Sequence, residues 1–308
     1  MVRWPDQPVT VRVPATSANL GPGFDSLGLA LTLSDTVRAR VLPSGLQVTV
    51  TGAGAGDLDR GEGHLVIRAM RAAFAAIGAQ PPGIEISCGN DVPQGFGLGS
   101  SAAAIVSGVL AARALAGAHG DAALPDDAVL ELTTQLEGHP DNIAACLLGG
   151  VTISWASASG VQAARLTPLA GLVPVLCVPA VPMSTQAARK ALPDQVPHAD
   201  AAANSARAAL LVAALTSRPD LLLAGTQDFL HQPYRAAAMP ATAALIGELR
   251  AAGIAAVVSG AGPSVLALTV SGTLPGPADV AKIAAEGAQV WRVLPLEVDT
   301  EGAVLLSD

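Results

Sequence analysis

The chain has 308 residues, 51% of them hydrophobic, and a formal net charge of −8. This length predicts about two domains. The acidic balance argues against a nucleic-acid or membrane partner, and no apolar run reaches the roughly 18 residues of a transmembrane helix. The N-terminus lacks the apolar core of a signal peptide, which predicts a cytoplasmic location. Cys88, Cys146 and Cys177 are isolated in the sequence and are expected to be buried free thiols.

Strands and helices are predicted in an irregular order in the first half of the chain. The predicted elements are strands over 9–13, 35–41 and 47–51, a helix over 64–77, a strand over 84–87, helices over 101–115 and 128–136, a helix from 140, and a strand over 151–155. They follow from alternating valines, apolar residues at helical spacing, and capping signals such as Gly78 and the pair Asp126 and Asp127. Because a regular alternation of strand and helix is missing, the order favours an α+β fold.

A polar, glycine-rich loop is predicted over 14–31, directly after the first strand. Asn19 and Asp25 are the side chains of this loop that are able to orient a small polar ligand. Both residue types are also common turn formers that bond their own backbone. From the residues alone, the two interpretations stay open.

The most prominent motif is a second glycine-rich loop, which runs into the helix over 101–115. Its residues are Asp91, Val92, Pro93, Gln94, Gly95, Phe96, Gly97, Leu98, Gly99, Ser100 and Ser101. Glycine permits positive φ and a close approach of the backbone to a ligand, and the N–H groups at a helix N-terminus attract anions. The two serine hydroxyls are placed to hold a metal ion that bridges phosphates. The alternative is a strand-to-helix turn without a ligand.

A cluster of polar side chains lies between the two helices predicted near residue 138. Glu137 ends the first helix, and Asp141 and Asn142 follow Pro140 at the start of the second. A carboxylate that faces a phosphate loop is a candidate Mg²⁺ ligand. The alternative interpretation of Glu137 is a surface charge or a cap.

The composition loosens over 156–171, which predicts a domain boundary there and two domains, 1–165 and 166–308. The predicted elements of the second domain are a strand over 173–179, helices over 184–189, 201–217, 219–226, 241–252 and 278–286, and strands over 255–258, 265–270, 289–295 and 303–306. Thr185 and Arg189 share one helical face because they are four residues apart. Together these elements predict a βαβ-containing sandwich.

Several nucleotide-binding mechanisms, and a serine hydrolase, are excluded by missing motifs. The chain has no G-x-x-x-x-G-K-[ST], no H-R-D with D-F-G, and no G-x-S-x-G around the two serines. Its glycines do not have the spacing of a dinucleotide-binding loop. Phosphate held by backbone amides, a helix dipole and Mg²⁺, with arginine supplied from elsewhere, is the remaining option.

The segment from Pro93 to Ala103 resembles the ATP-phosphate motif of the GHMP small-molecule kinases. The N-terminal signature over 14–31 and the turn over 259–264 look like those of the homoserine kinase branch, and matches in the same order follow at 137–142, 184–189 and 233–235. The resemblance spans nearly the whole chain. It implies an N-terminal α+β domain similar to ribosomal protein S5 and a C-terminal ferredoxin-like α/β sandwich, and a homodimer is a further expectation.

The resemblance also implies roles for individual residues. ATP phosphates are expected on the loop over 91–101, and Mg²⁺ on Glu137 and Ser101 or Ser100. L-homoserine, the expected small-molecule substrate, needs a carboxylate clamp, an ammonium partner and a hydroxyl positioner. The residues expected to bind it are Arg189 and Arg235 for the carboxylate, Asp25 and Asp141 for the ammonium and hydroxyl groups, Asn19, Asn142 and Thr185 as neutral hydrogen-bonders, and Gly262. Asn19, Asp25, Glu137 and Asn142 form the expected catalytic set, and the two aspartates are not assigned separately.

The expected reaction is a direct in-line phosphoryl transfer from ATP to the substrate hydroxyl, as part of threonine biosynthesis. Because no lysine lies near the glycine-rich loop, we expect positioning and charge neutralisation to matter more than formal base catalysis. His139 is expected to be structural. The alternatives are a kinase of the same family that acts on another small alcohol, such as mevalonate or shikimate, and a non-catalytic nucleotide-binding relative.

Overall fold

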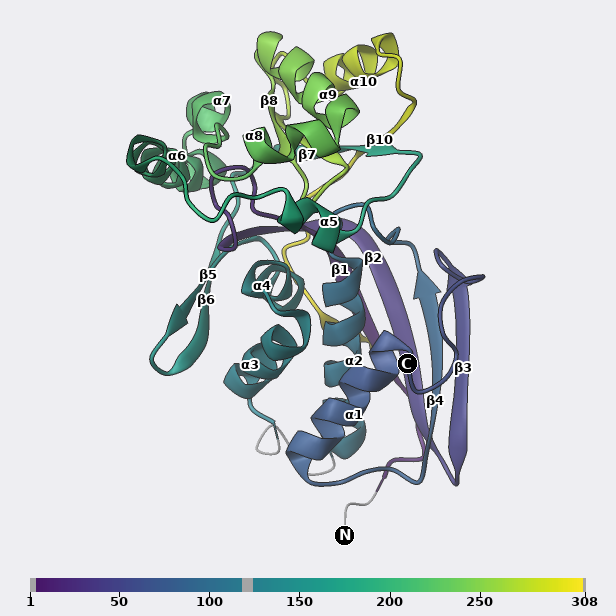
Figure 1. The fold of residues 1–308 in the computed structure, drawn as a ribbon. Coiled ribbons are helices and arrows are strands. Elements are labelled where there is room, and N and C mark those ends of the chain that lie inside the picture. Colours follow the sequence, from purple (N-terminus) through teal and green to yellow (C-terminus); the bar gives the residue numbers. More distant parts are fainter. Residues whose placement is uncertain (1–3, 118–123, 307–308) are drawn as a thin grey trace.

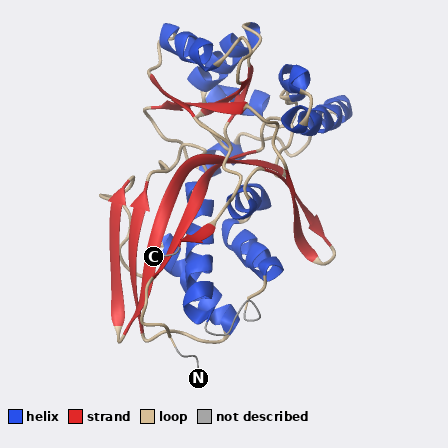
Figure 2. Cartoon of the chain, turned by 180° about the vertical axis from the view of Figure 1, so that it is seen from behind, coloured by secondary structure: helices blue, strands red, loops and turns tan. Residues whose placement is uncertain are grey.

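The computed structural model describes residues 4–117 and 124–306. The first of its two layered units is a seven-stranded sheet with helices α1 to α4 on one face (Figure 1). Its strands are β1 (Val9–Ala18), β2 (Leu27–Leu42), β3 (Gly45–Gly52), β4 (Gly83–Asn90), β5 (Val151–Ser157), β6 (Gly160–Leu166) and β11 (Val304–Leu306). Its helices are α1 (Leu65–Ile77), α2 (Ser100–Ala116), α3 (Asp126–Glu137) and α4 (Pro140–Leu148). The view from behind shows the opposite face of the sheet without helices (Figure 2).

The strand order explains why the sequence does not alternate strand and helix regularly. The main path is β11-β1-β2-β4-β3, and β5 pairs with both β2 and β6. Strands β3 and β4 are parallel and are connected through α1, whereas the other pairs in this sheet are antiparallel. The α+β fold expected from the sequence is confirmed.

The predicted loop over 14–31 is shorter than expected. Strand β1 continues to Ala18 after a register shift between Pro14 and Ala15, and β2 begins at Leu27. The residues from Pro14 to Ala18 are all buried. A strand that is buried on both faces shows no alternation of polar and apolar residues, so periodicity fails to find it.

Two other local expectations also need correction. The segment expected to be loose contains β6, which forms an antiparallel hairpin with β5; its partly exposed residues give no clear alternation. Asp126 and Asp127 were expected to cap α3, but Pro125 is the N-cap and both aspartates lie in the first turn. Negative charge there still favours the helix, because it faces the positive end of the dipole.

The core of this unit lies between the sheet and the pair α1 and α2. Helix α2 is buried along most of its length, and Gly108 lets α1 approach it: a Cβ at Gly108 would lie 2.6 Å from the carbonyl oxygen of Val66. This contact sets the position of α2, and therefore of the loop that precedes it.

The second unit is a four-stranded antiparallel sheet in the order β10-β7-β9-β8. Its strands are β7 (Leu172–Pro179), β8 (Ala255–Val258), β9 (Val265–Val270) and β10 (Trp291–Pro295). The helices of this half are α5 (Thr185–Lys190), α6 (His198–Thr216), α7 (Leu222–Gly225), α8 (Gln232–Arg235), α9 (Pro240–Ala251) and α10 (Pro277–Glu286), with 3-10 turns at Pro219–Leu221 and Ala236–Ala238. Because β7 is parallel to β8 with β9 between them, and β9 to β10 with β7 between them, the unit contains two split βαβ motifs. This is the expected ferredoxin-like sandwich.

The chain returns to the first unit after β10. Strand β11 pairs with β1, and Arg12 on β1 forms an ion pair of 2.6 Å with Asp299. The predicted division at 165/166 falls inside β6, just before its last residue, and remains a prediction. No helix in the described ranges is long and apolar enough to cross a membrane.

Candidate active site

Three segments far apart in the sequence are hydrogen-bonded to one another where the two units meet. The Thr16 amide donates to the Leu98 carbonyl at 3.0 Å, and the Gly260 amide donates to the Ala18 carbonyl at 3.2 Å. The Ser259 hydroxyl donates to the Gly97 carbonyl at 2.7 Å. The end of β1, the glycine-rich loop over 91–99 and the turn over 259–264 are therefore held as one rigid frame.

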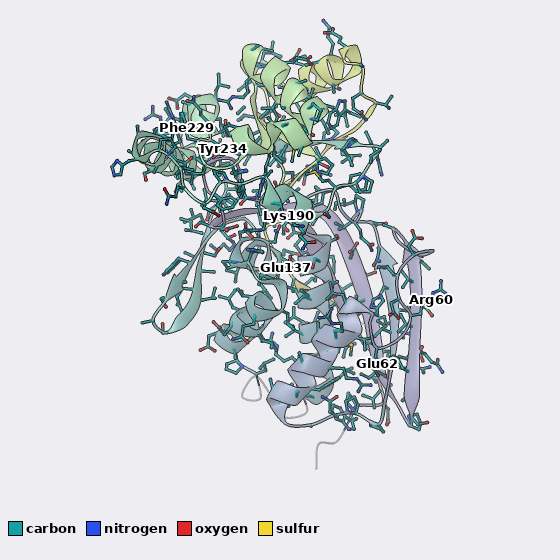
Figure 3. All side chains as sticks on the ribbon, in the orientation of Figure 1. Arg60, Glu62, Glu137, Lys190, Phe229 and Tyr234 are labelled. Atoms are coloured by element: carbon teal, nitrogen blue, oxygen red, sulfur yellow. The ribbon has the colours of Figure 1, made fainter. Side chains whose placement is uncertain are left out.

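A cavity at this frame brings together most of the residues predicted from the sequence. The predicted residues that line it are Asn19, Gly95, Gly97, Leu98, Gly99, Ser100, Ser101, Glu137, Asp141, Asn142, Arg189 and Arg235. His139, Gly260 and Ala261 also line it. Figure 3 shows Glu137 at the end of α3, just below α5 and the junction of the two units. Its lining therefore combines two serine hydroxyls, two carboxylates and two guanidinium groups.

The glycine-rich loop needs glycine at two positions for lack of space. A Cβ at Gly97 would lie 2.1 Å from the Ser259 carbonyl oxygen, and one at Gly99 would lie 1.9 Å from the Thr16 hydroxyl. Both glycines have positive φ, 75° and 69°. Gly99 is the N-cap of α2, so the free amides of the first turn of this buried helix face the cavity end of the loop.

Asp35 on β2 holds the start of this loop, a role that sequence reasoning missed. Its Oδ1 accepts hydrogen bonds from the Asp91 and Val92 amides, each at 2.8 Å. Burial raises the pKa of Asp35 to about 6, although the two amide donors act in the opposite direction. The only signal in the sequence was an acidic residue within a predicted strand, which is unfavourable without a partner.

Ser101 and Glu137 connect the start of α2 with the end of α3. The Ser101 hydroxyl donates to Glu137 Oε2 at 2.6 Å. Burial raises the pKa of Glu137, and the Ser101 hydrogen bond lowers it by a smaller amount. The described residues contain no group of three or more His, Cys, Asp or Glu side chains that could hold a metal. One carboxylate with one hydroxyl fits Mg²⁺, which retains waters and shares phosphate oxygens, better than a metal caged by protein alone.

Asp141 is the most deeply buried acid of the cavity, with 3% of its surface exposed. Burial raises the pKa of Asp141 to about 7. The backbone N–H of Asn142 donates to Asp141 Oδ1 at 2.7 Å and opposes this shift. Asn142 itself accepts a hydrogen bond from the Thr16 hydroxyl at Oδ1, at 2.7 Å. An acid with this pKa binds a cation well, because a positive partner offsets the cost of its buried charge.

The two arginines of the cavity have different partners. Arg189 on α5 forms an ion pair with Asp25, 2.7 Å between Nη2 and Oδ1. Arg235 on α8 is 1% exposed; its Nε donates to the Ala188 carbonyl at 3.1 Å and its Nη1 to His231 Nδ1 at 3.0 Å. Both guanidinium groups lie 5.6 Å from the centre of the Phe24 ring.

Three other residues predicted to bind the substrate are placed differently from that expectation or are not described. Asn19 has φ of 67° and uses its amide inside the protein: Nδ2 donates to the Gly260 carbonyl at 2.8 Å and Oδ1 accepts from the Asp25 amide at 3.0 Å. Gly262 faces Met239 and Val258, and its neighbours Gly260 and Ala261 line the cavity instead. The side chain of Thr185 lies outside the described part of the structure.

His139, which we expected to be structural, lies at the N-cap of α4 and lines the cavity. Burial lowers its pKa, and the nearby Arg189 charge lowers it further. Both effects favour the neutral imidazole, and the nearby Asp25 charge opposes them by a smaller amount.

A second cavity adjoins the first through Ser100 and Ser101, which line both. Its walls are mainly apolar, with Val37, Leu58, Leu65, Val66 and Ala104, and its polar side chains include Asp35, His64 and Asn90. His64 is 5% exposed, and neither of its ring nitrogens has a hydrogen-bond partner. Sequence reasoning did not find this cavity, because its residues come from four separate segments.

Comparison with known proteins identifies the family. The profile of the GHMP kinases N terminal domain matches residues 64–150, and that of the GHMP kinases C terminal matches residues 206–293. The chain is 54% identical to homoserine kinase of Streptomyces coelicolor, over 97% of this chain and 94% of that protein. It is 50% identical to homoserine kinase of Clavibacter michiganensis, over 96% and 93%.

Solved structures agree with this result. The crystal structure of homoserine kinase from Cytophaga hutchinsonii has a TM-score of 0.84 and 29% identity, and covers 99% of this chain and 100% of that one. Mevalonate kinase from L. major, at 15% identity and a TM-score of 0.71, shares the fold. The two matched domains and the fold define the class: the chain is a GHMP kinase. Its identity to curated relatives over nearly full length is more specific, and the chain belongs to the homoserine kinase family within that class.

Proposed function

We propose that this protein transfers the γ-phosphoryl group of ATP to the side-chain hydroxyl of L-homoserine and forms O-phospho-L-homoserine, a step of threonine biosynthesis. The observation that carries the proposal is the single cavity that combines the Gly99–Ser101 helix start, Glu137, Asp141 and the two arginines. Its relatives named homoserine kinase support the substrate.

The nucleotide is proposed to occupy both cavities. Its phosphates lie on the 91–101 loop, where the α2 amides and dipole stabilise negative charge. Its nucleoside enters the adjoining apolar cavity, where His64 lacks a protein partner. Asp35 keeps the start of this loop in place, because its carboxylate accepts hydrogen bonds from the backbone amides of Asp91 and Val92.

Ser101 and Glu137 are the proposed Mg²⁺ ligands. They come from different helices, and the Ser101 hydroxyl lies 2.6 Å from Glu137 Oε2. The metal ion, when bound, neutralises phosphate charge and orients the γ-phosphoryl group. Ser100 lines the same wall and is the alternative hydroxyl ligand.

The Arg189–Asp25 ion pair fits a zwitterionic amino acid. In the free protein the two charged groups bind one another. A bound amino acid offers a carboxylate to Arg189 and Arg235 and an ammonium group to Asp25 or Asp141. One ion pair within the protein is then replaced by contacts with both ends of the substrate.

Phosphoryl transfer is proposed to depend mainly on alignment. The substrate hydroxyl is held against the γ-phosphorus by the clamp on its carboxylate and by the side chains of Asp141, which is buried, and Asn142, which is half-buried. The helix α2 amides stabilise charge on the transferring group. No lysine among the described residues lines this cavity, so the proposal assigns no lysine-supported base.

The decisive experiment is incubation of the purified protein with Mg-ATP and L-homoserine, with release of ADP and formation of phosphohomoserine measured. Mevalonate, galactose and shikimate are the comparison substrates. Turnover of one of these in place of homoserine would indicate another kinase of the class, and ATP binding without turnover of any alcohol would indicate a non-catalytic relative. A cytoplasmic location and a homodimer belong to the same proposal, and size-exclusion chromatography with light scattering tests the dimer.

A further inference from the structure

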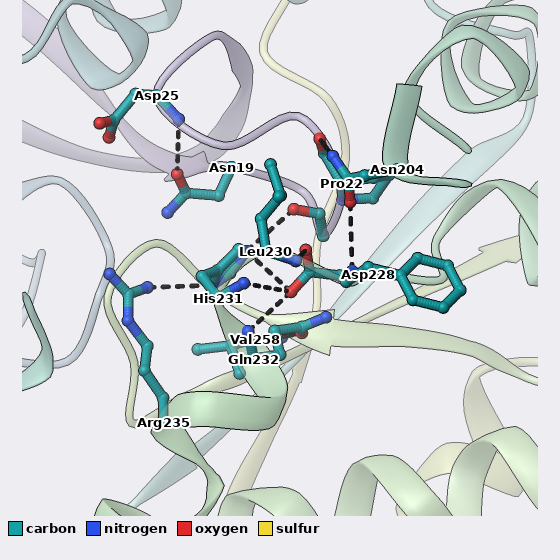
Figure 4. Close-up of polar contacts among 12 residues, drawn as sticks. Asn19, Pro22, Asp25, Asn204, Asp228, Leu230, His231, Gln232, Arg235 and Val258 are labelled. Atoms are coloured by element: carbon teal, nitrogen blue, oxygen red, sulfur yellow. Dashed lines mark hydrogen bonds and ion pairs between the residues drawn. The ribbon is translucent and has the colours of Figure 1, made fainter. Parts of the chain in front are cut away.

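His231 is a fully buried histidine that lies beside the cavity and does not line it. Its Nε2 lies 2.9 Å from the Gly21 carbonyl oxygen, and its Nδ1 lies 3.0 Å from Arg235 Nη1 (Figure 4). A carbonyl oxygen only accepts hydrogen bonds, and a guanidinium group only donates them. The two contacts together require a neutral ring with its proton on Nε2.

We infer that His231 is a positioning residue for the substrate carboxylate: its neutral ring holds Arg235 through Nδ1 and the loop that carries Asp25 through Nε2. The inference rests on the proposed function, because it concerns the arginine that is proposed to bind that carboxylate. It adds a residue that does not itself touch the substrate.

Neighbouring contacts show that His231 supports both arginines. Its ring lies 5.2 Å from that of Phe24, with 31° between the ring planes. Arg189 and Arg235 lie over the same Phe24 ring. A movement of His231 therefore displaces Arg235 directly and Arg189 through the aromatic ring between them.

Charged groups around His231 act in opposite directions. Asp228 Oδ2 lies 3.5 Å from Nε2 and, with the more distant Asp25, favours a charged ring, whereas burial and Arg235 disfavour it; burial dominates and lowers the pKa of His231. Asp228 is already occupied, because its carboxylate accepts the amide hydrogens of Leu230, His231 and Gln232.

Protonation of His231 would disrupt this arrangement. An Nδ1–H would face the N–H of Arg235, so two donors and two like charges would oppose one another in a buried position. The Arg235 guanidinium would then shift away from His231, while its hydrogen bonds to the Ala188 and Gly260 carbonyls remain. Affinity for the carboxylate of L-homoserine should decrease as the pH falls below the ordinary histidine pKa, with the midpoint lower than that value because the pKa is depressed.

A pair of amide variants separates positioning from packing. In His231→Asn the side-chain oxygen takes the position of the ring Nδ1 and remains an acceptor for Arg235. In His231→Gln the side-chain nitrogen takes the position of the ring Nε2 and remains a donor to the Gly21 carbonyl. We expect calorimetry to show that His231→Gln binds L-homoserine about tenfold more weakly than wild type and that His231→Asn stays within about threefold. Both variants should bind ATP as the wild type does. Equal losses in the two variants, or a greater loss in His231→Asn, would overturn the inference.

The pH dependence provides a second readout. The acid loss of homoserine affinity should be present in wild type and in the control His198→Asn, which changes an exposed histidine, and should be smaller in His231→Asn. An unchanged acid loss in that variant would contradict the inference. If wild type binds no L-homoserine, the proposed function fails, and ¹⁵N NMR of the histidine ring still tests the arrangement: a charged ring or an Nδ1–H tautomer at about pH 7.5 overturns it.

Discussion

Arg189 and Asp25 bind one another across the junction of the two units, with 2.7 Å between Nη2 and Oδ1. Arg189 comes from the short helix α5 and Asp25 from the loop between β1 and β2. About a third of each side chain is exposed, 32% and 34%. Arg189 also lines the cavity. Both charged groups are therefore accessible to a small molecule, and a zwitterion placed between them would satisfy both charges.

Asp25→Asn should weaken substrate binding selectively. The variant removes the charge proposed to face the substrate ammonium, so KM for L-homoserine should rise roughly 10- to 100-fold while KM for ATP changes little. Stability should change by less than about 1 kcal/mol, because the ion pair is partly exposed. Steady-state kinetics with each substrate varied in turn measures both values. Asp220→Asn, which breaks the exposed pair with Arg218, is the control, and an equal rise for ATP would contradict the assignment.

Glu137→Gln should reduce turnover more than substrate binding. The amide keeps the size and the hydrogen bond to Ser101 but loses the charge proposed to hold Mg²⁺. We expect kcat to fall about 100-fold, and higher Mg²⁺ concentrations to recover part of it. Glu131→Gln on the same helix is the matched control, because Glu131 contacts Val161 and Gln135, away from the cavity. A normal kcat in Glu137→Gln would exclude the metal role.

Asp141→Asn should stabilise the free protein and lower its activity. Burial raises the pKa of Asp141 from 3.8 to about 7. Above about pH 7 the folded state bears the full cost of the buried charge, and as the pH falls toward 3.8 the folded protein binds a proton that the unfolded chain does not, so this cost disappears. The free energy of unfolding of Asp141→Asn should thus exceed that of the wild type by up to about 4 kcal/mol near pH 8, and the difference should diminish toward pH 4.

Thermal unfolding at several pH values measures this dependence. Asp35→Asn is a useful comparison, because the pKa of Asp35 is also raised but its carboxylate holds two loop amides. A gain in Asp141→Asn that does not vary with pH would show that the buried charge is not its origin.

His64→Leu should separate the nucleotide cavity from the substrate cavity. In the free protein the ring nitrogens of His64 are buried without partners, so an apolar side chain should raise the free energy of unfolding by about 1 kcal/mol. KM for ATP should rise about fivefold if the nucleoside contacts this ring, while KM for L-homoserine stays near the wild-type value. Fluorescence titration with an ATP analogue and chemical denaturation provide the two measurements. Unchanged ATP affinity would remove His64 from the nucleotide site.

Features with a local physical cause were predictable from the sequence. The loop before α2 is rich in glycines with positive φ, the helix after it is rich in alanine, and Pro140 begins α4 as expected. These depend on residues that are neighbours along the chain. The resemblance of ordered motifs then indicated the fold class and the family, and both were confirmed.

Only the tertiary structure decided how these segments face one another. The sequence could place Arg189, Arg235 and Asp25 in motifs, but not show that Arg189 binds Asp25 while Arg235 is held by His231. Likewise the sequence assigned no role to Asp35 or His64, because their roles depend on burial and on the distant segments that surround them. Composition and spacing determine which elements form and what chemistry is present. Ionisation, orientation and access depend on the close packing of segments far apart in the chain, and that packing exists only in the folded protein.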